Sequence, residues 1–443
     1  MRARGVGREL ALSALLVTLG CTPDIGHDPV PEAMEFDTEA APPRVPQPTG
    51  LIVNPTTGRI DFALAGTPLP ADCAKSEVLS PAECQFDRYL ETLDGFPTLS
   101  PASAPATAAL EPTTLTLGEN VLVVPLRNPS TTPHVALGFD DGTRALSVRA
   151  EPSWAVGETY FVAVRGYEQG VRASSGTEVV GSPTQALIKQ DSSLTCGATT
   201  PEAIDPNCPA LELLAQTQPD AAARASAATL EAIRQSYLAS GIWQRLAGAG
   251  LPKSEVAVLW EFPIHTASVA ELDPSVGLVP EMSTANEIRV AVHGPVDPAS
   301  VSAFVVRKLP GSVVLMDLSA AATGDLVAGF PEIAAEYADG AIVMRGKASF
   351  VAGHQYGVFM TNDLRAPSGA SLVPAPISVL LSLAYPVADA NGKSLVSGVA
   401  DADAVVLEAG RAELATLFDN PVFGPLTGLT RDNLVYCFAF EAP

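Results

Sequence analysis

Short apolar runs follow one another along most of this chain, and turns containing glycine and proline separate them. This pattern predicts β-strands. In two segments the apolar residues recur instead at helical spacing. The first contains Leu230, Ile233 and Tyr237 after Asp220, a candidate helix N-cap, and the second extends over residues 407–418. The chain is therefore predicted to be mainly β, with small helical elements between groups of strands.

The same succession of patterns occurs twice. Gly157-Glu-Thr-Tyr160 recurs as Gly353-His-Gln-Tyr356, and the segment around Leu230 recurs around Leu407. A period near 180 residues indicates two duplicated domains rather than a solenoid, whose repeats run to roughly 20 to 50 residues. Each copy is predicted to be a β-sandwich followed by a small helical element.

The amino-terminal segment has a different pattern. Arginines precede the apolar stretch 10–19, and Gly20 and Cys21 follow it, which is typical of a secretory signal. A small residue before a cysteine resembles a bacterial lipobox, which implies cleavage before Cys21 and its acylation. Thr18 and Leu19 stand where a lipobox has leucine and a small residue, so an ordinary signal peptide or a short anchor is the alternative. About ten apolar residues are too few to span a bilayer, which takes roughly twenty.

The residues after Cys21 are rich in proline and acid, so they are expected to form an extended tether. The patterns divide the chain into six segments. They are a lipoprotein signal peptide (1–20), a disordered tether (21–50), an N-terminal segment with the first sandwich (51–195), a helical element (196–255), the second sandwich (256–390), and a helical element with a terminal strand (391–443).

The net charge of the chain limits the classes of partner that it can bind. The chain has 26 Lys and Arg against 49 Asp and Glu, a formal net charge of -23. Nucleic acid and anionic lipid are poor partners for a surface of this charge, so no nucleic acid partner is predicted. The membrane is expected to be contacted only through the amino-terminal lipid anchor.

Four cysteines are expected to form two short local disulfides. Cys73 and Cys84 bracket a loop that contains proline, as do Cys196 and Cys208. A metal site is not predicted, because neither pair has CxxC spacing or a second pair of ligands nearby. Cys437 lies in an apolar run and is interpreted as a buried, unreactive thiol.

The segment 434–440 is apolar on both alternating faces. A strand of this kind is expected to be covered on both sides. We expect it to pair into a sheet of its own chain, with docking onto a partner protein as the alternative.

One motif resembles a known family. Leu93-Asp-Gly-Phe-Pro-Thr98, which follows Asn54-Pro-Thr-Thr-Gly58, is similar to the start of the N-terminal region of bacterial virulence-factor lipases. The Gly-x-x-Tyr and Ser-Gly motifs of both copies are similar to those of bacterial Ig-like domains. The resemblance implies that the two sandwiches are Ig-like. In that family such modules precede a serine hydrolase domain.

No catalytic, cofactor-binding or metal-binding residue is predicted. The chain contains no Gly-x-Ser-x-Gly, and Ser175-Gly176 is duplicated as Ser368-Gly369, which favours a turn. The histidines, His354 among them, show no metalloprotease motif or close pairing. Two acidic turns that could attract calcium, 140–142 and 389–392, lack the further ligands of a calcium loop and are interpreted as hairpin turns.

The sequence therefore predicts a non-catalytic cell-envelope lipoprotein that displays binding or spacer modules. Many lipoproteins that stay at the inner membrane have aspartate directly after the lipidated cysteine, whereas this chain has Thr22 there. An outer-membrane location that faces the periplasm or the cell surface is therefore expected. The partner is an unknown envelope protein or polysaccharide. The alternatives are an accessory module that acts with a separate hydrolase, and a hydrolase with an unrecognised site.

Overall fold

The structure is a computed structural model of the 443-residue chain. It describes residues 31–442 except for short gaps, so Cys21 and the whole signal segment lie outside the described residues. The gaps are residues 39, 41–42, 66–67, 99, 129–130, 152, 217, 267–270, 273–280, 285, 294, 307–310 and 323–325.

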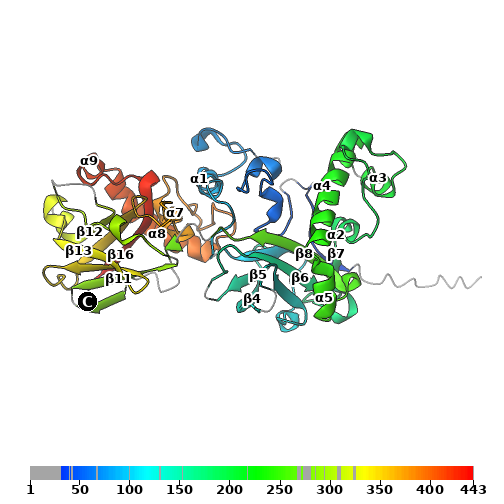
Figure 1. The fold of residues 1–443 in the computed structure, drawn as a ribbon, viewed down its shortest axis with the longest axis horizontal. Coiled ribbons are helices and arrows are strands. Elements are labelled where there is room, and N and C mark those ends of the chain that lie inside the picture. The colour runs from blue at the N-terminus through cyan, green and yellow to red at the C-terminus, as the bar shows by residue number, and fades with distance from the viewer. Residues whose placement is uncertain are drawn as a thin grey trace, which may run out of the picture.

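Two β-rich halves lie side by side along the long axis of the molecule (Figure 1). The first half contains two antiparallel sheets, each of three strands. In order across the sheets, the strands are β2 (Ala102–Pro105), β5 (Ala145–Ala150) and β4 (Val135–Asp140), then β3 (Val121–Pro125), β6 (Thr159–Arg165) and β8 (Val256–Pro263). The first half also has a parallel pair, β1 (Glu32–Met34) and β7 (Val179–Gly181).

The second half also contains two antiparallel sheets, one of five strands and one of three. One of its sheets has the order β10 (Glu281–Thr284), β11 (Glu287–His293), β14 (Ala341–Gly346) and β13 (Ile333–Ala338), with β9 (Glu271–Leu272) also on β11. The other has the order β12 (Val313–Asp317), β15 (Gln355–Thr361) and β16 (Leu434–Glu441). The mainly β class predicted from the sequence is confirmed.

Helices follow the strands in both halves. In the first half they are α2 (Pro183–Ile188), α3 (Pro209–Leu214), α4 (Asp220–Ala239) and α5 (Ile242–Gly248). In the second half they are α6 (Leu318–Ala321), α7 (Pro376–Ser382), α8 (Asp401–Phe418) and α9 (Phe423–Thr427). Among the residues described, no helix is both long enough and apolar enough to cross a membrane.

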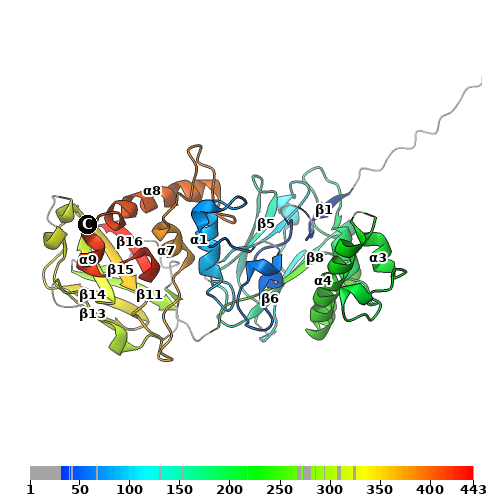
Figure 2. The same cartoon turned by 90° about the horizontal axis from the view of Figure 1, so that it is seen from above.

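Each half has three layers, which explains why its inner strands are apolar on both faces. In β15, Tyr356 and Val358 lie in the core between the two sheets. Phe359 points the other way and contacts Phe423 of α9, with ring centroids 6.0 Å apart. In β6 of the first half, Phe161 contacts Tyr237 of α4 in the same manner, at 5.9 Å. The helices therefore cover the outer face of one sheet (Figure 2).

The terminal strand β16 pairs antiparallel with β15, as expected from its two apolar faces. Its alternative, an uncovered strand that awaits a partner, is not what the structure shows, because the strand also packs against α7. Cys437 within it is buried, as predicted.

β8 differs from its expected place. The sequence was divided at residue 256, with this strand opening the second sandwich, but β8 pairs with β6 of the first half. The registers show why: Tyr160 is opposite Phe262 in the first half, and Tyr356 is opposite Phe440 in the second. The strand after each helical element thus returns to complete its own sheet.

Helix α1 (Pro81–Leu90) lies between the two halves (Figure 2). Its N-cap is Ser80, whose Oγ accepts a hydrogen bond from Glu83 N at 2.9 Å. The N-terminal segment was expected to pack on the first sandwich, and Leu90 does so. The opposite side of α1 contacts the second half: Ala82 is fully buried in a cluster with residues of α7 and of the segment that follows it, Leu380, Leu383, Val387 and Val396.

Polar contacts reinforce this joint, the contact of α1 with α7 and residues 383–397. Ser80 Oγ donates to the carbonyl oxygen of Leu395 at 2.5 Å. The side-chain oxygen of Gln85 accepts a hydrogen bond from Ala384 N at 3.1 Å. Because apolar burial and directed hydrogen bonds occur together, the joint fixes the two halves relative to each other.

Candidate functional site

An ion pair occurs at the same place in both halves and aligns them residue by residue. In the first half, Arg234 donates two hydrogen bonds to the carboxylate of Glu231, both at 2.8 Å. Glu231 Oε2 also accepts from Leu194 N at 2.8 Å. Arg234 and Glu231 are one helical turn apart on α4, and their side chains are only 4% and 13% exposed. The pair fastens the chain after α2 to α4.

The second half has the equivalent arrangement. Arg411 binds Glu408 at 2.7 and 2.8 Å, and Glu408 accepts from Val387 N at 2.8 Å. The residue whose backbone N–H donates and the glutamate that accepts are 37 positions apart in the first half and 21 positions apart in the second. The first half therefore carries 37 − 21 = 16 additional residues at this point.

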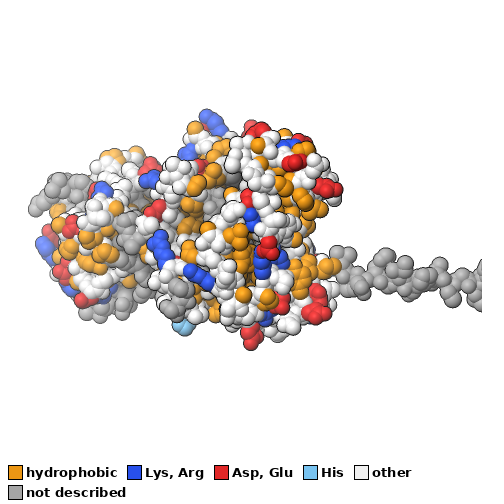
Figure 3. All heavy atoms as spheres, turned by 45° about the vertical axis from the view of Figure 1, so that its right-hand side comes forward, with side chains coloured by type: hydrophobic (Ala, Val, Ile, Leu, Met, Phe, Trp, Pro, Cys, Tyr) orange, Lys and Arg blue, Asp and Glu red, His pale blue; other side chains and the backbone are white. Residues whose placement is uncertain are grey.

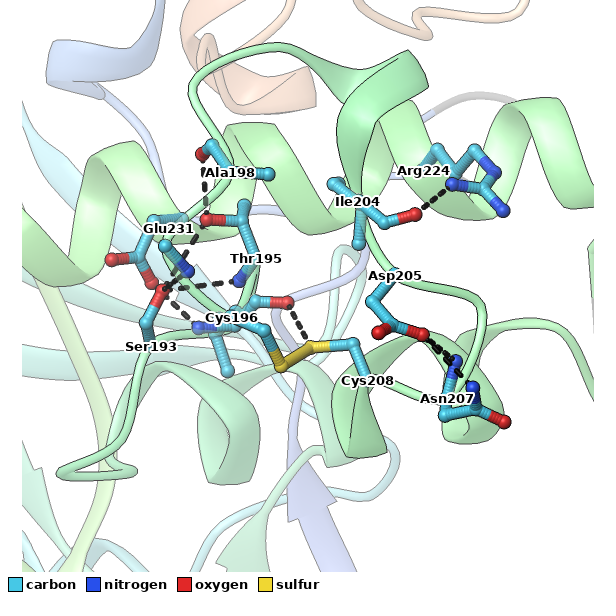
Figure 4. Close-up of a disulfide and its surroundings, with 12 residues drawn as sticks. Ser193, Thr195, Cys196, Ala198, Ile204, Asp205, Asn207, Cys208, Arg224 and Glu231 are labelled. Atoms are coloured by element: carbon cyan, nitrogen blue, oxygen red, sulfur yellow. Dashed lines mark hydrogen bonds between the residues drawn. A yellow bond between two sulfur atoms is a disulfide. The ribbon is translucent and has the colours of Figure 1, made fainter.

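The additional residues belong to a small unit that we call the disulfide lobe, residues 195–219. It contains the disulfide Cys196–Cys208 and helix α3, and it lies beside α4 at the outer end of the first half (Figures 1 and 4). Part of the lobe forms a small hydrophobic cluster of its own, while Ala210 of α3 lies in the main core. The buried members are Ile204, Cys208 and Leu211 from the lobe, with Ala223 and Ala227 from α4.

Hydrogen bonds between side-chain hydroxyl groups and the backbone hold the start of the lobe. Ser193 Oγ accepts hydrogen bonds from Thr195 N at 3.2 Å and Gly197 N at 3.3 Å, and Thr195 Oγ1 donates to the carbonyl oxygen of Ala198 at 2.9 Å (Figure 4). Further along, Asp205 Oδ1 accepts from Asn207 N at 2.8 Å. These hydrogen bonds give the start of the lobe a defined turn conformation.

A pocket of about 470 Å³ opens between the lobe and the first turn of α4. The pocket is a shallow hollow that is widely open to solvent, so it suits an exposed group on a larger partner rather than an enclosed small molecule. The pocket combines apolar surface with two carboxylates and two amides. Its lining residues are Pro206, Asn207, Leu211, Glu212, Ala215, Gln216 and Asp220.

The surroundings of the pocket are acidic. Glu202 and Asp205 are exposed on the lobe, as are Glu212 and Asp220 at the pocket itself. Arg224 is the nearby cation, and it pairs with Asp220 Oδ2 at 2.8 Å with a side chain only 16% exposed. Acidic side chains are prominent at this end of the molecule, at the upper right of Figure 3. The arrangement suits a group that donates hydrogen bonds or carries positive charge.

The other predicted disulfide is also present and has a different setting. Cys73 and Cys84 are 4% and 0% exposed, and Cys84 lies in α1. This disulfide therefore ties the loop before α1 to the joint. At Cys437, burial raises the pKa of the thiol to about 12, so the thiolate that could act as a nucleophile does not form at neutral pH.

The serine and histidine candidates occupy structural positions. Gly176 and Gly369 both have φ of +84°, and no atom outside their immediate neighbours lies within 4 Å of an added Cβ, as in an exposed turn. The sequence indicated no close partner for His354, yet its Nδ1 lies 2.8 Å from Asp317 Oδ2. Asp317 also accepts from Ala320 N at 2.8 Å as the N-cap of α6. Sequence reasoning missed this pair because 37 residues separate its members.

The two acidic turns bind their own backbone. Asp140 Oδ1 accepts from Gly142 N, and Asp389 Oδ1 accepts from Asn391 N and Lys393 N, all at 2.8 Å. These are Asx turns, which use the carboxylate to stabilise the loop. Within the described ranges, no group of three or more His, Cys, Asp or Glu residues could hold a metal ion.

The Leu93–Thr98 motif binds the end of β8 and the residues that follow it. Both carboxylate oxygens of Asp94 accept hydrogen bonds from Thr266, one from N at 3.0 Å and one from Oγ1 at 2.5 Å. Phe96 N donates to the carbonyl oxygen of Pro263 at 2.8 Å. Gly95 between them has no room for a side chain, because an added Cβ would lie 2.6 Å from His265 N. In this chain the motif is therefore a packing element.

No family model matches the chain, and no curated protein matches it. Among solved structures, the N-terminal part of the bacterial S-layer protein SbsC is similar at 15% identity, over 18% of this chain and 19% of that one, with a TM-score of 0.15. The S-layer protein rSbsC(31-844) and domains 1–6 of SbsC are similar at 14% identity, each over 18% of this chain and 11% of that one, also with a TM-score of 0.15. The chain spans less than a fifth of the length of each of these structures.

Proposed function

We propose that this protein is a non-catalytic lipoprotein of the cell envelope that holds a binding site, the disulfide lobe, on a rigid scaffold of two Ig-like β-sandwiches. Acylated Cys21 anchors it in the outer membrane, and the proline-rich segment after Cys21 spaces the scaffold from the lipid. A partner with amino or other hydrogen-bond-donating groups, on an envelope protein or polysaccharide, fits the pocket best.

The single observation that carries this proposal is the asymmetry between the halves. In the first half, 37 positions separate Leu194 from the carboxylate that binds its backbone N–H, and in the second half 21 positions separate Val387 from the equivalent carboxylate. The connection is therefore 16 residues longer in the first half, by the difference 37 − 21. In the second half this connection contacts α1 through Leu395 and forms part of the joint. In the first half it forms the disulfide lobe and its pocket. A stable scaffold with one enlarged, exposed loop is a common design for recognition.

The test is binding to isolated cell envelopes, measured by sedimentation with the protein from residue 22 onward. Glu212→Gln combined with Asp220→Asn should weaken binding about tenfold, and added salt should weaken binding of the parent protein. The matched control is Asp403→Asn combined with Glu413→Gln, which removes two exposed carboxylates from α8 and should leave binding unchanged. Equal losses in the two variants, or no binding by the parent protein, would refute the proposal.

The resemblance of the Leu93–Thr98 motif to lipase N-terminal regions supports a second candidate, an accessory module for a separately encoded hydrolase. In this case the purified chain hydrolyses no acyl ester by itself but changes the rate of the hydrolase. An ester-hydrolysis assay with and without the chain distinguishes the two candidates, because the binding protein leaves that rate unchanged.

A further inference from the structure

The two disulfides differ in how solvent reaches them. Cys73 and Cys84 are both buried, at 4% and 0% exposure. In the lobe, Cys208 is 1% exposed, but Cys196 is an exposed residue. Thiol–disulfide exchange begins when a thiolate reaches a sulfur atom, so access decides which sulfur is attacked. Of the two disulfides in the described chain, the lobe disulfide is thus the one with a solvent-exposed cysteine, and Cys196 is the side from which we expect attack.

The backbone at Cys196 is held in an unusual conformation. Its φ is +50°, in the left-handed region that residues other than glycine rarely adopt, and Gly197 follows with φ of +84°. The hydrogen bond from Gly197 N to Ser193 Oγ is long, at 3.3 Å. The turn is closed by the hydrogen bond from Ala198 N to the carbonyl oxygen of Thr195 at 3.0 Å, and the disulfide adds a covalent restraint on Cys196 within it.

The fold of each half does not depend on this disulfide. In the second half, residues 388–400 connect the equivalent points and contain no cysteine. The lobe disulfide fastens the small cluster of Ile204, Cys208 and Leu211 against α4. Ala210 of α3, which lies in the main core, and the hydrogen bond from Arg224 to the carbonyl oxygen of Ile204 add to this contact. A cluster of this size holds a segment only weakly without a covalent cross-link, so we expect cleavage to loosen the lobe and leave the β-sheets intact.

We propose that Cys196–Cys208 is a thiol-exchange site for a protein dithiol, and that its redox state decides whether the lobe is closed or open. A thiolate of the dithiol attacks Cys196 Sγ and forms a mixed disulfide with it. The Cys208 sulfur leaves as a thiolate and takes a proton from water. The second thiolate of the dithiol attacks the mixed disulfide and frees Cys196 as a thiolate, which is protonated in turn. The dithiol is oxidised by two electrons, and the lobe disulfide is reduced to two thiols.

This inference goes beyond the proposed function and can fail or succeed separately from it, because its experiments measure sulfur chemistry rather than binding. In the first experiment, the folded protein is treated with limiting dithiothreitol, and free thiols are trapped by alkylation and mapped by mass spectrometry. Cys196 and Cys208 should be labelled at least tenfold faster than Cys73 and Cys84. Equal rates, or faster labelling of Cys73 and Cys84, would overturn the proposal.

A second experiment identifies the attacked sulfur. A thioredoxin-type dithiol protein whose second cysteine is replaced by serine cannot resolve the mixed disulfide, so the adduct accumulates. We expect the adduct on Cys196. An adduct on Cys208 or on the buried pair, or no adduct, contradicts the proposal.

Hydrogen exchange tests the opening. Reduction of the lobe disulfide in the parent protein should raise the exchange rates of amides 195–215 at least tenfold, while β16 keeps its protection. The double variant Cys196→Ser with Cys208→Ser should show the same exchange rates without reductant. Unchanged protection of residues 195–215 after reduction would show that the disulfide does not control the lobe.

Discussion

The hydroxyl group of Tyr89 donates a hydrogen bond to the carbonyl oxygen of Pro374 at 2.6 Å, although 285 residues separate them. Tyr89 lies in α1 near the end of the joint, and Ser80 makes the corresponding contact with Leu395 at its beginning. The joint is therefore fastened at both ends of one short helix.

Loss of both hydroxyl groups should loosen the joint. We expect Tyr89→Phe combined with Ser80→Ala to lower the free energy of unfolding by about 3 kcal/mol, because each of the two hydrogen bonds across the joint contributes about 1 kcal/mol and the helix cap at Ser80 about 1 kcal/mol more. Denaturant unfolding measures the change, and small-angle X-ray scattering should show a larger radius of gyration. Tyr167→Phe, in the first half and away from the joint, is the matched control and should leave the radius unchanged.

Asp87 makes stability depend on pH. Burial, with the nearby Glu83 and Glu91 adding to it, raises the pKa of this carboxyl from 3.8 to about 8. Between these two values the folded protein keeps a proton that the unfolded chain has lost, so stability falls as the pH rises from about 4 to 8. The loss should amount to roughly 3 to 5 kcal/mol at pH 8.

Asp87→Asn replaces the buried carboxyl with an amide that does not titrate, so unfolding at this position no longer releases a proton. The variant should be more stable than the parent protein at pH 8, with a flatter dependence on pH between 4 and 8, as measured by denaturant unfolding at each pH. Glu83 is unchanged in the variant, and burial raises its pKa as well, so part of the slope should persist. A variant as pH-dependent as the parent would contradict the assignment to Asp87.

The duplicated ion pair allows a comparison within one molecule. Burial opposes ionisation of Glu231, but hydrogen bonds from Arg234, Gln235 and Leu194 outweigh it and lower the pKa of Glu231 to about 2. Its contribution to stability is therefore present above about pH 4.5 and is lost as the pH falls toward 2. Glu231→Gln should cost about 2 to 3 kcal/mol at neutral pH, because it leaves Arg234 buried without a full counter-charge.

Glu408→Gln is the matched change in the second half. Its cost should be smaller, because the side chains of Glu408 and Arg411 are 25% and 9% exposed against 13% and 4% for the first pair. Urea unfolding of both variants gives the order, and a larger loss for Glu408→Gln would show that exposure does not govern the difference.

Gly95→Ala tests the packing role of the Leu93–Thr98 motif. The new Cβ would lie 2.6 Å from His265 N and 2.7 Å from Ile264 C, and neither backbone atom can move freely. We expect a loss of about 2 to 4 kcal/mol in thermal or denaturant unfolding. Gly58→Ala is the control, because Gly58 has positive φ but nothing within 4 Å, so its loss should be only about 1 kcal/mol.

Cys21→Ser tests the anchor. The variant should incorporate no palmitate in metabolic labelling, because it lacks the thiol that is acylated. Where residues 1–20 are still removed, it should also leave the membrane fraction. Lysates are separated by ultracentrifugation, and Cys437→Ser is the control that should remain with the membranes and keep its label. Palmitate incorporation by the Cys21→Ser protein would contradict the lipoprotein proposal.

Local patterns in the sequence predicted much of this structure. The disulfides could be predicted because each pair closes a short loop, and the pairing of β16 because both faces of 434–440 are apolar. The joint could not, since Ser80 and Leu395 are 315 residues apart and neither has a distinctive local pattern. β8 was assigned to the wrong sandwich because alternation shows that a segment is a strand but not which strand lies beside it.

The pocket was also beyond sequence reasoning. Helix α3 has only six residues, too few for a clear helical period. The sequence pattern of the lobe therefore predicted only a loop closed by a disulfide. A sharper comparison of the two repeats contained a signal: the spacing from the residue before the loop to the Leu-Glu-Ala segment differs between copies. That difference marks an insertion without revealing its shape.

The joint also sets an order of assembly. Its first residues, around Ser80, are synthesised more than 300 residues before the segment that covers them, since Ser80 and Leu395 are 315 positions apart. During synthesis and export the apolar side of α1, with Ala82, must wait uncovered until the second half has formed. A growing chain is most open to aggregation and to chaperone binding during this interval, and a slow second half prolongs it. Changes that delay folding of residues around Val387 and Val396 should therefore reduce the yield of the protein even where they leave the finished molecule stable.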